Sequence, residues 1–200
     1  MNVELITPAT LEAVSLEELK LHLRIELDAP DEDEYLEGLV KSAREYVEDV
    51  TRRQLLTSTW DYYLDKWPTE NFISLPFGNL QTVTHVKYKK SDWVSPAAEE
   101  SLTVTTDYLV ETNSDQFGRI VLAYNESWPT DTLYPSKPIV IRFVCGWTTA
   151  ALIPYEIKAA IKMIAAKLYE SRGEDVLGQT VSENKTVDSL LWSKRLWGNF

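Results

Sequence analysis

The feature that most constrains this chain is a change of hydrophobic period, from helical to extended and back to helical. Residues 16–53 place apolar side chains three and four positions apart, as amphipathic helices do. From residue 57 to residue 147 apolar side chains alternate with polar ones, and Pro and Gly separate the alternating stretches. Residues 154–172 return to the helical spacing. Because strands do not alternate with helices, the pattern predicts an α+β fold rather than a doubly wound parallel sheet.

We expect a helical core that is interrupted by a mostly antiparallel β insertion. The core comprises two N-terminal helices, one long C-terminal helix and a short terminal helix, with the insertion between the second and third helices. Residues 1–200 are expected to form a single domain, in which 1–56 and 150–200 are helical and 57–149 are β-rich. The most apolar stretch of the insertion, residues 138–144, predicts a central strand.

Capping signals mark the helix ends. Ser15 followed three residues later by Glu18 forms a capping box that starts the first helix. Asp31 is the predicted N-cap of the second helix, Pro154 is the predicted first residue of the third, and Gly173 is its predicted C-terminal cap.

Charge limits the partners of this chain. Twenty Lys and Arg against 31 Asp and Glu give a net charge of −11, and the first 50 residues hold 14 acidic but only four basic residues. Such a surface repels DNA phosphates and anionic membranes. Cys145 is the only cysteine, and neither a signal peptide pattern nor an apolar run of membrane-spanning length is present. We therefore expect a protein that is kept in a cytoplasm, or assembled there into something larger.

The residues that most often perform chemistry form no recognisable motif. His22 and His85 have no evident catalytic or metal-binding partner, and Cys145 ends an apolar strand without a base nearby in the sequence. The acidic cluster of residues 28–34 lacks the order of a calcium loop, and the glycines match no phosphate-binding spacing. We expect no enzymatic activity, no metal and no cofactor.

Tryptophans offer two binding hypotheses. Trp67 and Trp128 each precede a proline in a loop, where an indole either stacks on a ligand such as a glycan or packs in the core. The terminal segment mixes leucine, tryptophan and basic side chains, and its candidate binding residues are Leu190, Leu191, Trp192, Lys194, Arg195 and Trp197. This segment either docks on the chain's own core or binds another subunit, and its chemistry leaves both possibilities open.

Three blocks of sequence follow one another in an order that a known family shares. The first covers residues 14–24, the acidic turn 31–34 and residues 36–48, and the second contains 73–76, 83–88, Tyr108 and 118–120. The third contains 144–147, 153–154 and 168–172, followed by Leu190 and Leu191 before Arg195. Together the blocks resemble the head–tail connector (neck adaptor, or head-completion) family of tailed bacteriophages and prophages. Cys145 replaces the small Ala that is common before Gly in that family, and residues 196–200 extend beyond its usual end.

The resemblance implies a single connector domain and a structural virion protein rather than an enzyme. Members form a closed homo-oligomeric ring, usually twelvefold, beneath the portal protein, extend the DNA channel and present a surface to the next neck or tail protein. It assigns Leu190, Leu191, Trp192 and Arg195, and by extension Trp197, to portal binding. DNA then passes through the ring without being tightly bound, no membrane takes part, and assembly into the virion neck occurs in the cytoplasm of the host bacterium.

Two alternatives accompany this interpretation. One is a later-acting neck or tail-completion protein, and the other is a ligand-binding module that uses Trp67 or Trp128. The long helix expected from Asp31 to Arg53 is a candidate for packing between subunits, as well as for packing in the core.

Overall fold

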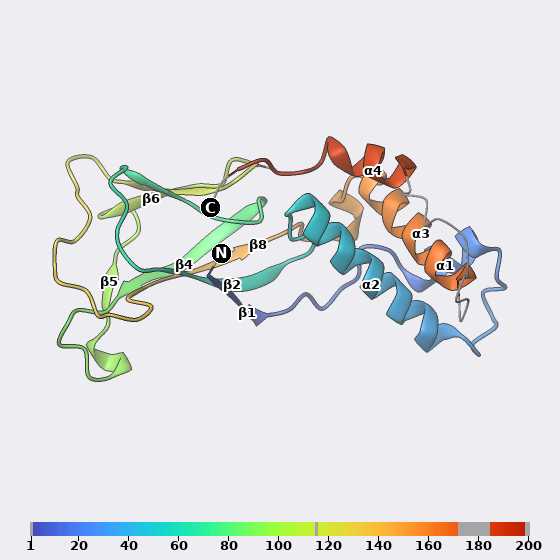
Figure 1. The fold of residues 1–200 in the computed structure, drawn as a ribbon, viewed down its shortest axis with the longest axis horizontal. Helices are drawn as coiled ribbons and strands as arrows, with labels where there is room; N and C mark the ends of the chain where they lie inside the picture. Colours follow the sequence, from blue (N-terminus) through green and yellow to red (C-terminus); the bar gives the residue numbers. More distant parts are fainter. Residues whose placement is uncertain (1, 115, 172–184, 199–200) are drawn as a thin grey trace, which may run out of the picture. The chain divides into compact units, whose positions relative to one another are not determined.

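The computed structural model describes residues 2–114, 116–171 and 185–198, which fold into two compact units (Figure 1). The β unit comprises the described residues of 1–9, 57–146 and 196–200. The helical unit comprises those of 10–56 and 147–195. The α+β class predicted from the sequence is confirmed, whereas the expectation of a single domain stays a prediction.

Two antiparallel sheets form the β unit. The five-stranded sheet has the order β1 (Val3–Thr7), β2 (Ser58–Leu64), β8 (Ile139–Cys145), β4 (Leu80–Tyr88) and β5 (Glu100–Leu102). The three-stranded sheet has the order β3 (Phe72–Ser74), β7 (Arg119–Leu122) and β6 (Tyr108–Glu111), and a 3₁₀ turn, η1 (Pro96–Ala98), precedes β5. The central place predicted for the most apolar strand is confirmed, since it is β8.

The core of the β unit is built from the inner faces of both sheets. Along β8, residues 139, 141, 143 and 145 are buried and the residues between them are not, which is the alternation of a strand with one core-facing side. Sequence patterns miss β1 and β3. β1 is an edge strand with mostly exposed side chains, and β3 has only three residues, so neither carries a readable stripe.

An ion pair fixes the register of β2 on β8. Asp61 lies directly opposite Arg142 and accepts two hydrogen bonds from its guanidinium group, both of 2.7 Å. The Asp61 side chain is only 5% exposed, so the Arg142 guanidinium, rather than water, is the partner that stabilises this carboxylate.

Four α-helices and one short 3₁₀ turn form the helical unit. They are α1 (Leu16–Leu23), α2 (Asp33–Thr51), η2 (Ala150–Leu152), α3 (Tyr155–Glu170) and α4 (Lys185–Trp192). Both α1 and α4 pack against the pair formed by α2 and α3 (Figure 1). The buried stripe of α3 consists of Ile157, Ala160, Ile161 and Ala165, as its sequence period predicts.

The buried stripes are narrower than the apolar sequence patterns. Tyr35 and Tyr46 on α2 and Leu168 on α3 continue the helical spacing, yet they are 38%, 50% and 42% exposed. Tyr35 and Tyr46 lie beside the buried stripe of α2. Leu168 continues the stripe of α3, but it comes after the last buried residue, Ala165, near the end of the helix.

The capping box that starts α1 is confirmed. The Ser15 hydroxyl accepts a hydrogen bond from the Glu18 N–H, and the Glu18 carboxylate accepts one from the Ser15 N–H. Glu18 also pairs with Lys158 of α3 at 2.7 Å. Burial alone raises the pKa of Glu18, but Lys158 and the Ser15 N–H outweigh burial and hold this pKa below its ordinary value.

The predicted N-cap of α2 is wrong. α2 begins at Asp33, with Glu32 rather than Asp31 at the N-cap position and no side-chain cap. The Asp33 N–H donates to the carbonyl of Pro30, which closes a turn before the helix starts. The Asp33 carboxylate pairs with the buried Lys20, so a tertiary ion pair sets the start of α2.

The start predicted for α3 is one residue early. Pro154 is the N-cap rather than the first helical residue, and the helix begins at Tyr155. Both placements use the fixed φ of proline, but only the N-cap leaves ψ extended, as observed here at 138°. The predicted cap Gly173 lies outside the described residues.

Replacing Arg142 by Gln should destabilise the protein by about 3 kcal/mol, because Asp61 would remain buried without its partner. Arg119 provides a matched control, since it also pairs with a cross-strand carboxylate, Glu111, but both side chains are 41% exposed. Arg119→Gln should cost at most about 1 kcal/mol. Urea denaturation of both variants measures the difference, and equal costs would contradict the role assigned to Asp61.

The Glu18–Lys158 pair predicts a pH dependence. A carboxyl whose folded pKa is depressed adds stability above its unfolded pKa, and this stability is lost as pH falls through the folded pKa. Glu18→Gln should therefore be less stable than the unsubstituted protein at pH 7, and the gap should close as the pH falls below about 4. Denaturant titrations at both pH values test this, and a gap that persists in acid would refute the assignment.

Candidate partner-binding site

The terminal segment begins with an amphipathic helix. α4 packs against α3 and α2 through Val187 and Leu191, whose side chains are 3% and 1% exposed. Leu190 is half-buried, and Trp192 is 65% exposed. The short terminal helix predicted from the sequence is thus confirmed.

Two contacts hold the chain that follows α4 within the helical unit. The buried Arg53, just beyond the C-terminal end of α2, donates from Nε to the carbonyl of Lys194 at 2.6 Å. The Lys194 ammonium lies 3.4 Å from the Glu156 carboxylate at the start of α3. The backbone N–H of Glu156 and the Lys194 charge together hold the pKa of Glu156 below its ordinary value. Part of the positive charge of the segment is therefore paired with a carboxylate of the same protein.

The last described residues belong to the β unit. Leu196 is 1% exposed and Trp197 is 61% exposed. Gly198 passes so close to Phe117 that a Cβ on it would lie 2.7 Å from the phenyl ring. Leu196 and Gly198 therefore fix the backbone on both sides of Trp197 while its indole faces outward.

The structure divides the six predicted site residues into an anchoring group and an exposed group. Leu191 is buried, Leu190 and Arg195 are half-buried, and Lys194 is anchored by its contacts. Trp192, in the helical unit, and Trp197, in the β unit, present exposed indoles. Exposed tryptophans beside basic side chains have the composition of interface hot spots. Portal binding by these residues stays a prediction.

The sequence gives no sign of the residues that anchor this segment. Arg53 and Glu156 lie 141 and 38 positions from Lys194 along the chain. Only the packing of α2, α3 and α4 brings them together, so no local pattern could have identified them.

The tryptophans proposed to stack on a ligand lie in the core of the β unit. The Trp67 and Trp128 rings stack on each other, with centroids 5.1 Å apart and planes 6° apart, and Trp67 meets the edge of Tyr88. Trp128 is 8% exposed and donates from Nε1 to the carbonyl of Glu70 at 2.8 Å. Stacking of a glycan on Trp128 is therefore wrong, because the ring is buried and one face is already covered.

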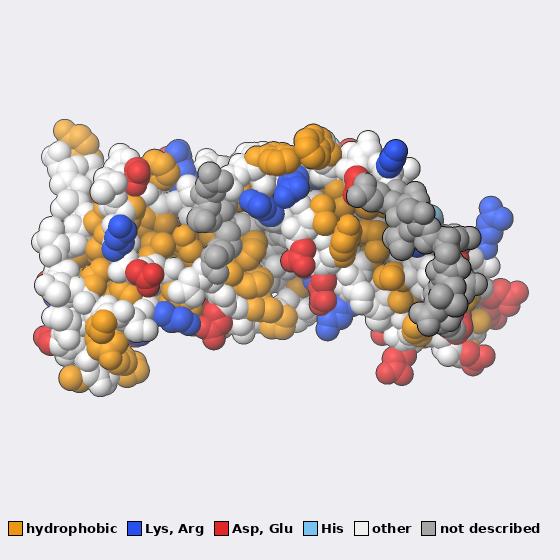
Figure 2. All heavy atoms as spheres, viewed as in Figure 1, with side chains coloured by type: hydrophobic (Ala, Val, Ile, Leu, Met, Phe, Trp, Pro, Cys, Tyr) orange, Lys and Arg blue, Asp and Glu red, His pale blue; other side chains and the backbone are white. Residues whose placement is uncertain are grey.

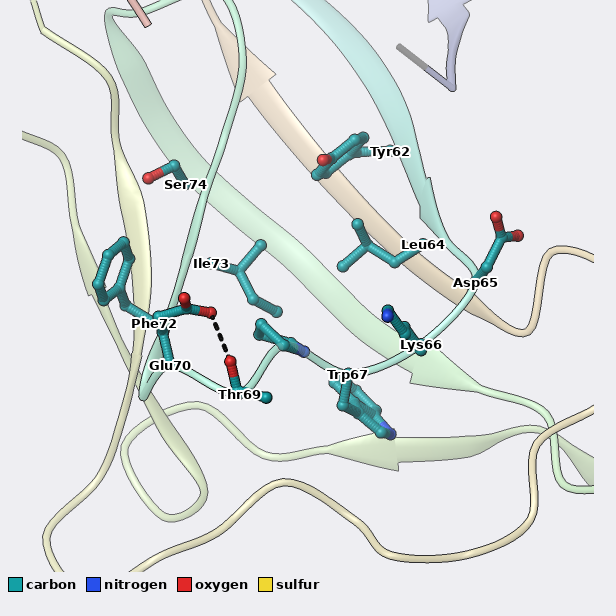
Figure 3. Close-up of a pocket in the computed structure, with 11 residues that line it drawn as sticks. Tyr62, Leu64, Asp65, Lys66, Trp67, Thr69, Glu70, Phe72, Ile73 and Ser74 are labelled. Carbon is teal, nitrogen blue, oxygen red and sulfur yellow. Dashed lines mark hydrogen bonds between the residues drawn. The ribbon is translucent and has the colours of Figure 1, made fainter. Parts of the chain in front are cut away.

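Trp67 also lines a pocket of about 670 Å³ (Figure 3). Leu64 and Ile73 lie toward its middle, and Asp65 and Lys66 lie on the loop that borders it (Figure 3). Thr69 and Glu70 of the same loop are joined by a side-chain hydrogen bond of 3.3 Å. The pocket is apolar in its middle and polar at its rim, with no set of side chains arranged for catalysis.

The remaining chemical candidates are dispersed. His22 is exposed on α1, His85 is half-buried on β4, and Cys145 is buried on β8. Burial and the nearby Lys87 lower the pKa of His85. Within residues 2–114, 116–171 and 185–198, no three His, Cys, Asp or Glu side chains gather as a metal site would require. None of the helices in these ranges is long and apolar enough to cross a bilayer.

Comparison with known proteins finds a matching family model and solved structures of similar fold. The family model for the phage gp6-like head-tail connector protein matches residues 13–118, which is more than half of the chain. Among curated proteins, no sequence matches.

Solved structures match over the full length. A chain from the neck of an empty gene transfer agent (GTA) particle, computed with C6 symmetry, has a TM-score of 0.77 at 21% identity. A chain from the native GTA virion gives 0.76 at 20%, and one from the native neck, computed with C12 symmetry, gives 0.75 at 19%. Each match covers 100% of this chain and 98% of the other. The likeness establishes a shared fold.

The division of the terminal segment predicts that two neighbouring substitutions differ strongly in their effect on stability. Leu191→Ala should destabilise the protein by about 2–4 kcal/mol, because it leaves a cavity under α4. Trp192→Ala should change stability by no more than about 0.5 kcal/mol, because the indole is exposed. Thermal and urea unfolding of the two variants test this, and a large loss for Trp192→Ala would mean that the indole belongs to the core.

Proposed function

Because this chain belongs to the phage gp6-like head-tail connector family, we propose that it forms a ring that joins the portal of a capsid to the tail and extends the DNA channel. The family description makes it a structural connector of a phage-like particle. We further propose that the protein lies in the virion neck and that it is assembled in the cytoplasm of the host bacterium.

The proposal of a ring is supported by the similar chains from GTA necks. Those necks were computed with C6 and C12 symmetry, so their proteins occur in symmetric assemblies. A twelvefold ring of this chain is compatible with both symmetries. Rings of identical subunits arise when two different surfaces of a subunit meet and the rotation closes.

The observation that carries portal binding is the exposure of Trp192 and Trp197 in a terminal segment that is otherwise anchored. Covering an exposed indole with a partner is favourable, because apolar surface is removed from water. Leu190 and Arg195 lie beside these indoles in the sequence and extend the same apolar and basic chemistry. We assign Leu190, Leu191, Trp192, Lys194, Arg195 and Trp197 to the portal-binding segment, with Leu191 and Lys194 shaping it from within.

The acidic surface suits a channel through which DNA slides. The net charge of −11 is repeated in every copy of a ring. Acidic side chains are visible on the helical unit around the start of α2 (Figure 2). A wall of this charge does not retain phosphates, so DNA passes without tight binding.

A later-acting neck or tail-completion protein is the second candidate. Such a protein would bind only after an adaptor is already on the portal, whereas the proposed connector binds the portal directly. The order of binding therefore separates the two functions.

Replacing Trp192 and Trp197 together by Ala should weaken binding to the portal from the same genome at least tenfold. Substitution is preferable to removing the segment, because Val187, Leu191 and Leu196 are buried. Tyr124→Ala is the control, since Tyr124 is a 92% exposed aromatic residue on a β-unit loop. Surface plasmon resonance with immobilised portal measures both variants. Unchanged affinity of the double variant would reject the assigned interface, and no binding by the unsubstituted protein would favour the later-acting candidate.

A further inference from the structure

The two sheets of the β unit differ in width, and the narrower sheet leaves part of the wider one uncovered. Five strands face three. On β2, the side chains of Trp60, Tyr62 and Leu64 pack against the core, yet all three are only half-buried. On the neighbouring β1, Leu5 lies opposite Trp60 on the same side of the sheet and is 45% exposed. The core is therefore incompletely covered over β1 and β2.

The pocket of about 670 Å³ that Trp67 lines lies at this uncovered part. Tyr62 and Leu64 of β2 line it, and so do all three residues of β3. Figure 3 shows Ile73 of β3 pointing toward Leu64 across the pocket, whereas its two neighbours on β3 point the other way. The pocket thus has apolar side chains in its middle and a strand along its border.

The free side of that strand carries backbone groups without a partner. β3 is the last strand of its sheet and pairs with β7. The Leu75 N–H donates to the carbonyl of Gly118, just beyond this ladder, at 2.8 Å. Because hydrogen-bonded and non-hydrogen-bonded pairs alternate in an antiparallel sheet, the N–H and C=O groups of Phe72 and Ser74 point away from β7. Within the described part of the chain these groups form no hydrogen bond, and we refer to them as the β3 edge.

An extended peptide segment is the partner that fits the pocket and the β3 edge together. Its backbone can pair with Phe72 and Ser74, as in other complexes in which a peptide adds a strand to a sheet. Every second side chain of such a segment then points to the core side of the sheet, over Tyr62 and Leu64. A compact or helical partner would leave the backbone groups of the β3 edge unpaired.

The charges at the rim of the pocket add a preference. Asp65, Lys66 and Glu70 are exposed on the loop between β2 and β3. None of the three forms an ion pair with another described residue, so one negative charge is in excess. The rim therefore favours a segment that carries a basic side chain beside its apolar ones.

A second copy of this chain offers a matching edge, but with the wrong symmetry. The Tyr63 N–H donates to the carbonyl of Asn2, so the same alternation turns the backbone groups of Val3 and Leu5 outward on β1. Because β1 and β3 border the same uncovered part of the core, two copies that paired these edges would do so reciprocally. A reciprocal contact closes a dimer, whereas the proposed ring needs two different surfaces.

We propose that an extended apolar segment of the next neck or tail protein adds to the β3 edge as a fourth strand and fills this pocket. The proposal rests on the connector function proposed above, and it identifies the surface that receives the following protein. The terminal segment is assigned to the portal, which leaves the β3 edge for the protein that binds next.

Hydrogen–deuterium exchange tests this without any substitution. The full-length protein is measured alone, on the portal, and on the portal after addition of the purified next neck or tail protein from the same genome. The Phe72 and Ser74 amides should exchange at least tenfold more slowly only in the last sample, because only there do they donate to a new strand. The Val3 and Leu5 amides should exchange equally in all three samples.

A proline substitution tests the same edge by affinity. Ser74→Pro removes an N–H that points away from β7, so it should leave the sheet intact and weaken binding of the next protein about tenfold. Val3→Pro is the matched control, since it removes an outward N–H from β1 and should bind normally. Thermal unfolding checks that both variants fold, and the exchange measurement remains decisive if Ser74→Pro does not.

Three results would overturn the proposal. If the next protein binds while the Phe72 and Ser74 amides keep their exchange rates, another surface receives it, although the connector function stands. If the amides of β1 and β3 become protected together in the protein alone, a second copy occupies the edge. If the protein forms neither a ring nor a complex with the portal, the connector function fails, and this proposal fails with it.

Discussion

Arg44 and Glu48, one turn apart on α2, organise the part of the helical unit where the chain enters and leaves it. Their side chains are 2.6 Å apart, and Arg44 also reaches Glu12 at 2.8 Å. Burial disfavours the Arg44 charge, but these carboxylates outweigh burial and raise its pKa. Burial raises the pKa of Glu48 despite its hydrogen bonds from Arg44 and the Leu55 N–H. A buried cluster of this kind tolerates loss of a member poorly, because the remaining charges lack water.

The same side chains hold the ends of the two segments that make up the helical unit. Those segments are residues 10–56 and 147–195. Glu12 is held by Arg44, Leu55 by Glu48, and the N–H of Trp147 by the carbonyl of Leu55 at 3.1 Å. Arg53 holds the carbonyl of Lys194. The terminal segment is therefore anchored by the residues that organise the helical unit, which leaves Trp192 exposed on a firmly held backbone.

Sequence reasoning succeeded where the signal was local. The apolar run of residues 138–144 and the Ser15–Glu18 spacing are both local signals, and the central strand and the capping box that they predict are both present. It failed where a residue that is distant in the sequence determines the local structure. Lys20 sets the start of α2 through Asp33, and β1 is a strand because β2 offers it an edge.

The candidate site shows the same division. Its composition could be read from the sequence, because indoles and basic side chains within eight residues are a local pattern. The sequence does not show which of these side chains face water, because their exposure depends on packing against α3 and on the contact with Arg53.

The central claim is that this acidic, two-unit protein is a ring-forming connector on the portal. Electron microscopy of the purified protein mixed with portal from the same genome, over a concentration series, tests it most directly. The account predicts a closed tier of density beneath the portal, with the symmetry of a subunit ring. A protein that stays monomeric and apart from the portal at every concentration would contradict it.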